Sequence, residues 1–142
     1  MTETDAMLTL GRQVLAMQPF SVYMGAQLTA FGAERTELVI PLKPEYAQQD
    51  GFVHGGVISY AADNALTFVG GLALDPAVLT AEYKINYVRP ARGDTLVARA
   101  SVIATGKRQA VCRCDVLVRT GADEYLCATA QGTVVATGTP AS

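Results

Sequence analysis

The segment that most constrains the fold is residues 54–74, HGGVISYAADNALTFVGGLAL. It is longer than an ordinary strand and its apolar residues do not alternate with polar ones, so it predicts a helix. Because it is apolar on nearly every side, we expect other structure to surround it. Gly70 and Gly71 are expected to end or loosen this helix.

Shorter elements are predicted on both sides of this helix. Apolar residues at helical spacing predict a helix over residues 4–17, with Thr4 as its N-cap and Pro19 as its stop. Alternating apolar residues predict two strands next, and a polar loop follows at 44–53. Four more strands follow the long helix, separated by turns that contain glycine. The six predicted strands cover residues 21–32, 34–43, 78–90, 94–105, 108–119 and 124–137.

This order of elements predicts an α+β fold. The last four strands can pair as an antiparallel meander through their short turns. A curved antiparallel sheet of about six strands, wrapped around the long central helix, would bury both, and a short N-terminal helix would complete the fold. The length of 142 residues suits a single domain over residues 1–142, with 138–142 as a flexible tail.

Composition excludes several classes of protein. Half of the residues are apolar and 17% are charged, which argues against disorder, and the net charge of −2 argues against a nucleic-acid partner. No stretch of about 18 uncharged apolar residues and no basic leader is present, so we expect a cytoplasmic protein without a membrane span. Cys112, Cys114 and Cys127 match no common zinc spacing, and Cys112 and Cys114 are expected to be core residues. Some apolar surface is expected to lie under a partner subunit.

The start of the long helix is the first candidate site. His54, the only histidine in the chain, precedes Gly55 and Gly56 there. A helix start presents free backbone N–H groups and a partial positive charge, and two glycines let a ligand atom approach closely. Such a helix end can bind an anion or polarise a carbonyl group whose oxygen becomes negative during reaction.

Asp63 is the second candidate. It shares one row of the helix with Ser59 and Thr67 and lies among alanines. A functional carboxylate and a structural one, paired with a cation or a backbone N–H, are both consistent with this position. Gly56 and Asp63 are about 10 Å apart along the helix axis. If both act on one carbonyl group, they must come from two antiparallel copies of the helix, which predicts a homodimer.

These motifs resemble those of the hotdog-fold thioesterases, and most closely the phenylacetate-pathway (PaaI-like) acyl-CoA thioesterases. The resemblance covers residues 20–137 in the order of elements and is strongest over 48–96. It rests on the His-Gly-Gly start of the helix, on Asp63 nine positions after His54, and on the later segments YKINYVRPA (83–91) and Gly93-Asp94.

The resemblance implies hydrolysis of an acyl-CoA thioester in a homodimer or a dimer of dimers. Asp63 would act as general base or nucleophile, and the N–H of Gly55 or Gly56 from the opposite subunit would polarise the carbonyl group. His54 would orient the loop or contact the thioester, and Thr80 would help to hold water. Gln48 or Gln49 takes the place of a frequent asparagine. No metal or cofactor is implied, because coenzyme A enters as part of the substrate.

Four basic residues are candidates for binding the phosphates of coenzyme A. Arg89 and Arg92 follow one strand, and Lys107 and Arg108 lie at the next hairpin. For any single one of them, ordinary solvated turn charge is the favoured explanation.

Two other functions fit the same motifs. An enoyl-CoA hydratase or dehydratase would use His54 with Asp63 as acid and base, and hydration without release of a thiol would identify it. A non-catalytic acyl-CoA-binding protein would use the same fold without turnover.

Overall fold

The strands form one antiparallel sheet in the order β1-β2-β4-β5-β6-β3. We describe it from a computed structural model that covers residues 2–32, 34–74 and 77–138. The strands are β1 (Gln27–Phe31), β2 (Thr36–Pro41), β3 (Val78–Tyr87), β4 (Thr95–Thr105), β5 (Gln109–Thr120) and β6 (Asp123–Ala136). The helices are α1 (Glu3–Ala16), α2 (Pro19–Met24) and α3 (Gly55–Leu74), with a short 3₁₀ turn η1 (Pro44–Tyr46).

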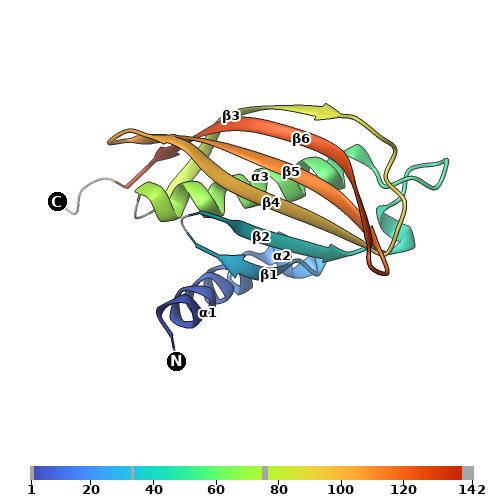
Figure 1. Cartoon of the computed structure of the whole chain (residues 1–142), viewed down its shortest axis with the longest axis horizontal. Coiled ribbons are helices and arrows are strands. Elements are labelled where there is room, and N and C mark those ends of the chain that lie inside the picture. The colour runs from blue at the N-terminus through green and yellow to red at the C-terminus, as the bar shows by residue number, and fades with distance from the viewer. Residues whose placement is uncertain (1, 33, 75–76, 139–142) are drawn as a thin grey trace.

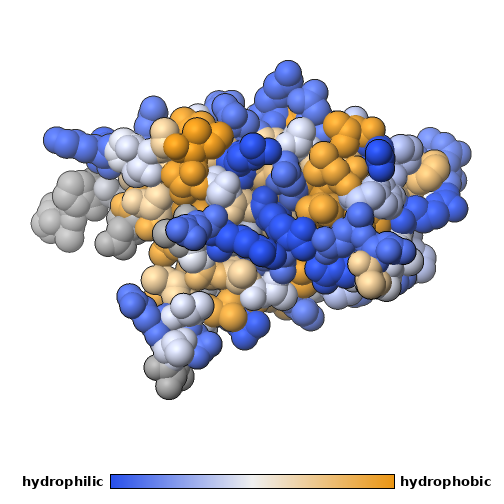
Figure 2. Space-filling view, in the orientation of Figure 1, coloured by the Kyte–Doolittle hydropathy of each residue, from blue (hydrophilic) through white to orange (hydrophobic). Residues whose placement is uncertain are grey.

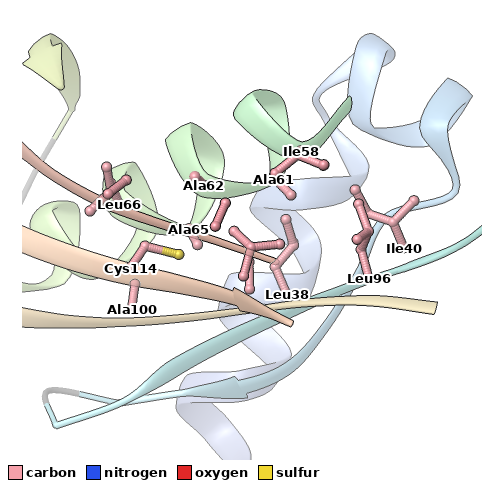
Figure 3. Close-up of a cluster of buried hydrophobic side chains, with 14 of the residues drawn as sticks. Leu38, Ile40, Ile58, Ala61, Ala62, Ala65, Leu66, Leu96, Ala100 and Cys114 are labelled. Carbon is pink, nitrogen blue, oxygen red and sulfur yellow. The ribbon is translucent and has the colours of Figure 1, made fainter. Parts of the chain in front are cut away.

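The sheet curves around α3, as Figure 1 shows. Alanines on the buried side of α3 let the strands approach closely, and Ala61, Ala62 and Ala65 are fully buried. Leu38, Leu96 and Cys114 meet this side of the helix from β2, β4 and β5 (Figure 3). The α+β hotdog architecture predicted from the sequence is confirmed.

Helix α3 is also long and apolar enough to cross a membrane by length and composition alone, with a mean hydropathy of 1.3. In the structure it packs against β2, β3, β4, β5 and β6. The core of a globular fold accounts for the same composition.

The pairing of β3 differs from the predicted meander. Strands β4, β5 and β6 do form a meander, but β3 pairs with β6 and not with β4, so it lies at one edge of the sheet. The chain therefore crosses from one edge of the sheet to its middle between β3 and β4. A prediction based on short turns misses this, because strand pairing is decided by packing around α3 and not by distance along the chain.

A β-bulge interrupts β3 at Ala81. Thr80 pairs with Val134 and Glu82 with Thr133, so Ala81 is an extra residue opposite two consecutive residues of β6. Residues three apart in a regular strand face opposite sides of the sheet. The extra residue brings Thr80 and Tyr83 onto the same side, the side that faces α3.

The N-terminal third of the chain differs most from the prediction. The strand expected over 21–32 is instead helix α2 followed by the shorter strand β1. Pro19 does not only stop α1 but begins α2, and Gly25 ends α2 in the left-handed conformation (φ 71°). Val22 and Met24 belong to the alternating pattern that predicted this strand, but they lie in α2, where Val22 is exposed and Met24 is buried.

Two helix ends also differ. The N-cap of α1 is Thr2 and not Thr4, because the Thr2 hydroxyl accepts a hydrogen bond from Asp5 N and the Asp5 carboxylate accepts one from Thr2 N. Helix α3 continues past Gly70 and Gly71 to Leu74. The flexible tail predicted at 138–142 lies, apart from Gly138, outside the described residues.

Charged and apolar residues both reach the surface, and a hydrophilic band crosses the middle of the view in Figure 2. Glu37 on β2 is 8% exposed and receives hydrogen bonds from Arg99 and Arg35. Burial alone would raise the pKa of Glu37, but the two guanidinium groups outweigh it and lower this pKa to about 2. Exposed apolar side chains lie mainly on α1, α2 and β3.

Candidate active site

A row of hydrogen bonds joins one face of α3 to β3. Thr80 Oγ1 donates to Asp63 Oδ1 at 2.6 Å, Tyr83 and Ser59 share a hydrogen bond, and Tyr87 donates to the carbonyl oxygen of Gly55 at 3.0 Å. The helix residues are spaced by four, and the strand residues share one face because of the bulge at Ala81. The tyrosines were not predicted as site residues, although their spacing of four within one strand places them on one face.

Asp63 is half-buried and hydrogen-bonded to a neutral hydroxyl group. Its second oxygen, Oδ2, has no hydrogen-bond partner among the described residues, and no ion pair of those residues includes Asp63. A structural pairing with a lysine or arginine is therefore not what holds this carboxylate. The arrangement leaves one carboxylate oxygen open to accept a proton or to attack.

His54 caps the start of α3 with its side chain. The ring Nδ1 accepts a hydrogen bond from Gly56 N at 2.8 Å, and the backbone oxygen of His54 accepts from Val57 N at 2.9 Å. The N–H of Gly55 has no acceptor among the described residues. Of the two candidate amides, that of Gly55 is thus the one not already used within the helix end.

A cavity of about 390 Å³ opens at this helix end. Gln48, Gly55, Tyr87 and Arg89 contribute to its lining. The side-chain oxygen of Gln48 accepts a hydrogen bond from Asp50 N, which fixes the turn that precedes the helix. The cavity therefore brings together the loop before α3, the first turn of α3 and the end of β3.

The other predicted basic residues do not line this cavity. Arg92 donates to the carbonyl oxygen of Asp50 at 3.0 Å, and its guanidinium group lies 4.6 Å from the centre of the Phe52 ring, so it holds the loop. Lys107 and Arg108 lie at the opposite end of the sheet, because Gln109 pairs with Val135 whereas Tyr87 pairs with Ala128. In one copy of the chain the two predicted pairs of basic residues do not meet.

A second polar cluster, not predicted from the sequence, links α2 to α3. The hydroxyl of Tyr60 donates to Ser21 Oγ, and Asn64 Nδ2 donates to Gln18 Oε1 and to Ser21 Oγ, both at 3.1 Å. Burial raises the pKa of the Tyr60 hydroxyl. Asn64 follows Asp63 directly, so this cluster fixes the rotation of α3 at the carboxylate.

Comparison with known proteins identifies the family. The model of the thioesterase superfamily matches residues 50–125. This range includes the start of α3, Asp63, the β3 residues that bond to α3 (Thr80, Tyr83 and Tyr87) and the four predicted basic residues. The chain belongs to the thioesterase superfamily. A crystal structure of a thioesterase family protein from Silicibacter pomeroyi has a TM-score of 0.82 and 31% identity, covering 87% of this chain and 93% of that one.

Two Escherichia coli proteins are also similar to this chain. The medium/long-chain acyl-CoA thioesterase YigI is 26% identical over 82% of this chain and 86% of its own length. The PaaI protein of the phenylacetic acid degradation operon has a TM-score of 0.84 at 18% identity, over 96% of this chain and 97% of that one, a likeness of fold alone. The prediction of a thioester hydrolase with the hotdog fold is confirmed.

Proposed function

We propose that this thioester hydrolase acts on acyl-CoA, with Asp63 as general base or nucleophile. The observation that carries the proposal is the hydrogen bond from Thr80 to Asp63 Oδ1, which fixes the carboxylate and leaves Oδ2 without a partner among the described residues. Thioesters have little amide-type resonance, so a single carboxylate and one polarising group suffice to activate them.

The start of α3 supplies the polarising group. The N–H of Gly55 is unpaired among the described residues, and Gly55 lines the cavity with Gln48 and Arg89. A backbone N–H at a helix start stabilises the negative charge that develops on the carbonyl oxygen during attack. His54 positions this helix end through its bond to Gly56 N.

Both groups act on one thioester only if they come from two copies of the chain. Helix α3 runs without interruption from Gly55 to Leu74, so Gly55 and Asp63 are about 12 Å apart along its axis. Strand β3 offers a means of association, because it is an edge strand of ten residues whose outer side pairs with no other strand in the described part of the chain. Antiparallel pairing of two β3 strands would place two α3 helices side by side in opposite directions. A homodimer with two equivalent sites results.

The same arrangement explains how the separated basic residues would serve one coenzyme A. Arg89 lines the cavity at the start of α3. Lys107 and Arg108 lie near the other end of α3, which in an antiparallel dimer adjoins the start of the partner's helix. Phosphates would be held by Arg89 of one subunit and by the hairpin of the other, without a metal or a further cofactor.

The test is the Asp63→Asn variant, which keeps the size of the side chain and removes its negative charge. Release of free thiol from acyl-CoA should fall by about 10²–10⁴-fold, the usual contribution of a general base, with the circular dichroism spectrum unchanged. Asp123→Asn, a change at an exposed carboxylate at the start of β6, is the matched control and should leave the rate unchanged. Full activity of Asp63→Asn would disprove the proposed site.

A further inference from the structure

An apolar groove of about 600 Å³ lies between α1 and the C-terminal half of α3. Leu10 and Val14 of α1 form one wall, and Leu72 of α3 with Val78 of β3 forms the other. Phe31 and Phe68 also line it, with their rings edge to face and 5.5 Å apart. The lining is apolar except for Gln18 and Thr67.

The groove begins beside the candidate carboxylate. Thr67, one of its lining residues, lies one turn beyond Asp63 on the same face of α3. On the opposite side, the lining residue Val78 lies two positions before Thr80, on the same face of β3, and Thr80 donates to Asp63. A group attached to a carbonyl carbon held at Asp63 therefore has an apolar path leading away from the carboxylate.

Helix α1, which forms one wall of the groove, is held closely against β1. A Cβ on Gly11 would lie 2.6 Å from side-chain atoms of Leu28 and Phe31, so the glycine is what allows α1 to lie this close to β1. Arg12 Nε donates to the carbonyl oxygen of Leu28 at 2.9 Å. With α1 held on that face, Leu10 is 56% exposed and Val14 39% exposed, one turn apart along the groove.

We propose that this groove holds the acyl chain of the substrate and that the chain is unbranched and aliphatic. The inference rests on the proposed acyl-CoA hydrolysis and adds its substrate class. The lining residues of α1 extend from Met7 to Val14, about 10 Å along the helix. A flexible chain can follow such a path over its whole length, whereas a single aromatic ring would fill only one end of it.

The length of the acyl chain should then determine how much apolar contact the substrate makes with the groove. Each methylene buried against apolar side chains contributes about 0.8 kcal/mol, which corresponds to about a fourfold rise in kcat/KM. The value of kcat/KM should therefore rise steeply from butanoyl-CoA to octanoyl-CoA. It should also be higher for octanoyl-CoA than for phenylacetyl-CoA.

The experiment compares these substrates in the wild type and in Leu10→Trp, which fills the groove from an exposed position. The variant should lose about tenfold or more of kcat/KM for octanoyl-CoA and less than about twofold for butanoyl-CoA. Val14→Trp should have the same effect and serves if the first variant folds poorly. Val22→Trp, at an exposed aliphatic residue of α2 outside the groove, is the matched control and should change neither value.

Three results would overturn the assignment of the groove while leaving acyl-CoA hydrolysis intact. These are a wild-type rate independent of chain length, a preference for phenylacetyl-CoA, and an equal loss for both substrates in Leu10→Trp. An equal loss accompanied by a change of molecular mass in size-exclusion chromatography would assign the groove to a second copy of the chain. Failure of the wild type to hydrolyse any acyl-CoA would instead refute the proposed function itself.

Discussion

Gly70 of α3 lies so close to Val134 of β6 that a Cβ atom on the glycine would stand 2.7 Å from the Cβ of the valine. Both Cγ atoms of Val134 would lie at 2.9 Å, so no rotation of the valine side chain makes room. The distance between α3 and β6 is set at this contact.

Gly70→Ala should therefore destabilise the fold. Alanine favours a helix interior over glycine by about 1 kcal/mol, but overpacking at this contact costs about 1–3 kcal/mol and should win. Gly71→Ala is the matched control, because its Cβ would meet only Val78 Cγ2, at 3.3 Å. Urea unfolding of both variants measures the difference. Equal free energies of unfolding would show that α3 shifts to accept the extra methyl group.

Thr80→Val should reduce turnover without unfolding the chain, because valine has the shape of threonine and no hydroxyl group. A hydrogen bond to a charged group is worth about 1.5–3 kcal/mol, so kcat should fall by about 10–100-fold. Thr80→Ser keeps the hydroxyl and should restore most of kcat. A KM effect alone, or failure of the serine variant to rescue, would show that Thr80 does not position Asp63.

His54→Ala should weaken the start of α3, since it removes the acceptor of Gly56 N and leaves a helix end without its cap. The expected loss of stability is about 1 kcal/mol, measured by chemical unfolding. His54→Asn restores a side chain that caps well and should recover this stability. If kcat recovers with it, His54 only positions the helix end; if stability recovers and kcat does not, the imidazole ring contacts the substrate.

Acid should destabilise the fold through Glu37. Its pKa is lowered from 4.5 to about 2 in the folded chain, so it stabilises the fold above pH 4.5, and this contribution is lost as the pH falls towards 2. Glu37→Gln should remove this part of the pH dependence and lower stability at neutral pH by up to about 3 kcal/mol. Thermal unfolding between pH 2 and pH 7 tests this. Glu45→Gln, at an exposed residue of η1, should leave the pH profile unchanged.

The sequence predicted the central helix and the number of strands well, because long periodic segments carry a strong local signal. Helix α3 lacks both alternation and a polar face, which is how a helix inside a sheet must look. Helix α2 was missed because its apolar residues Val22 and Tyr23 point outward while Ser21 is buried in a polar cluster. Gly70 was misinterpreted because a glycine needed for close contact resembles a glycine that ends a helix.

The candidate site was predictable only where it is local. His54, Gly55 and Gly56 are adjacent in sequence, and the spacing of Ser59 and Asp63 follows from one helix. The contacts of Thr80 and Tyr83 with that helix depend on the edge position of β3 and on the bulge at Ala81. Neither feature leaves a mark in the local pattern of residues, since both are decided by pairing with β6.

The bulge at Ala81 adds one residue to β3 without shifting its pairing with β6, and it changes which side of β3 faces α3 on the two sides of the bulge. Residues on the C-terminal side of Ala81 keep their partners on the helix whether or not the extra residue is present. Residues on its N-terminal side depend on the bulge: a regular ladder that kept Ala81 would turn Thr80 and the groove residue Val78 to the outside of the sheet together, whereas deletion of Ala81 would leave both facing α3. The contact of Thr80 with Asp63 and the groove face at Val78 thus depend on the same irregularity in the pairing of β3 with β6.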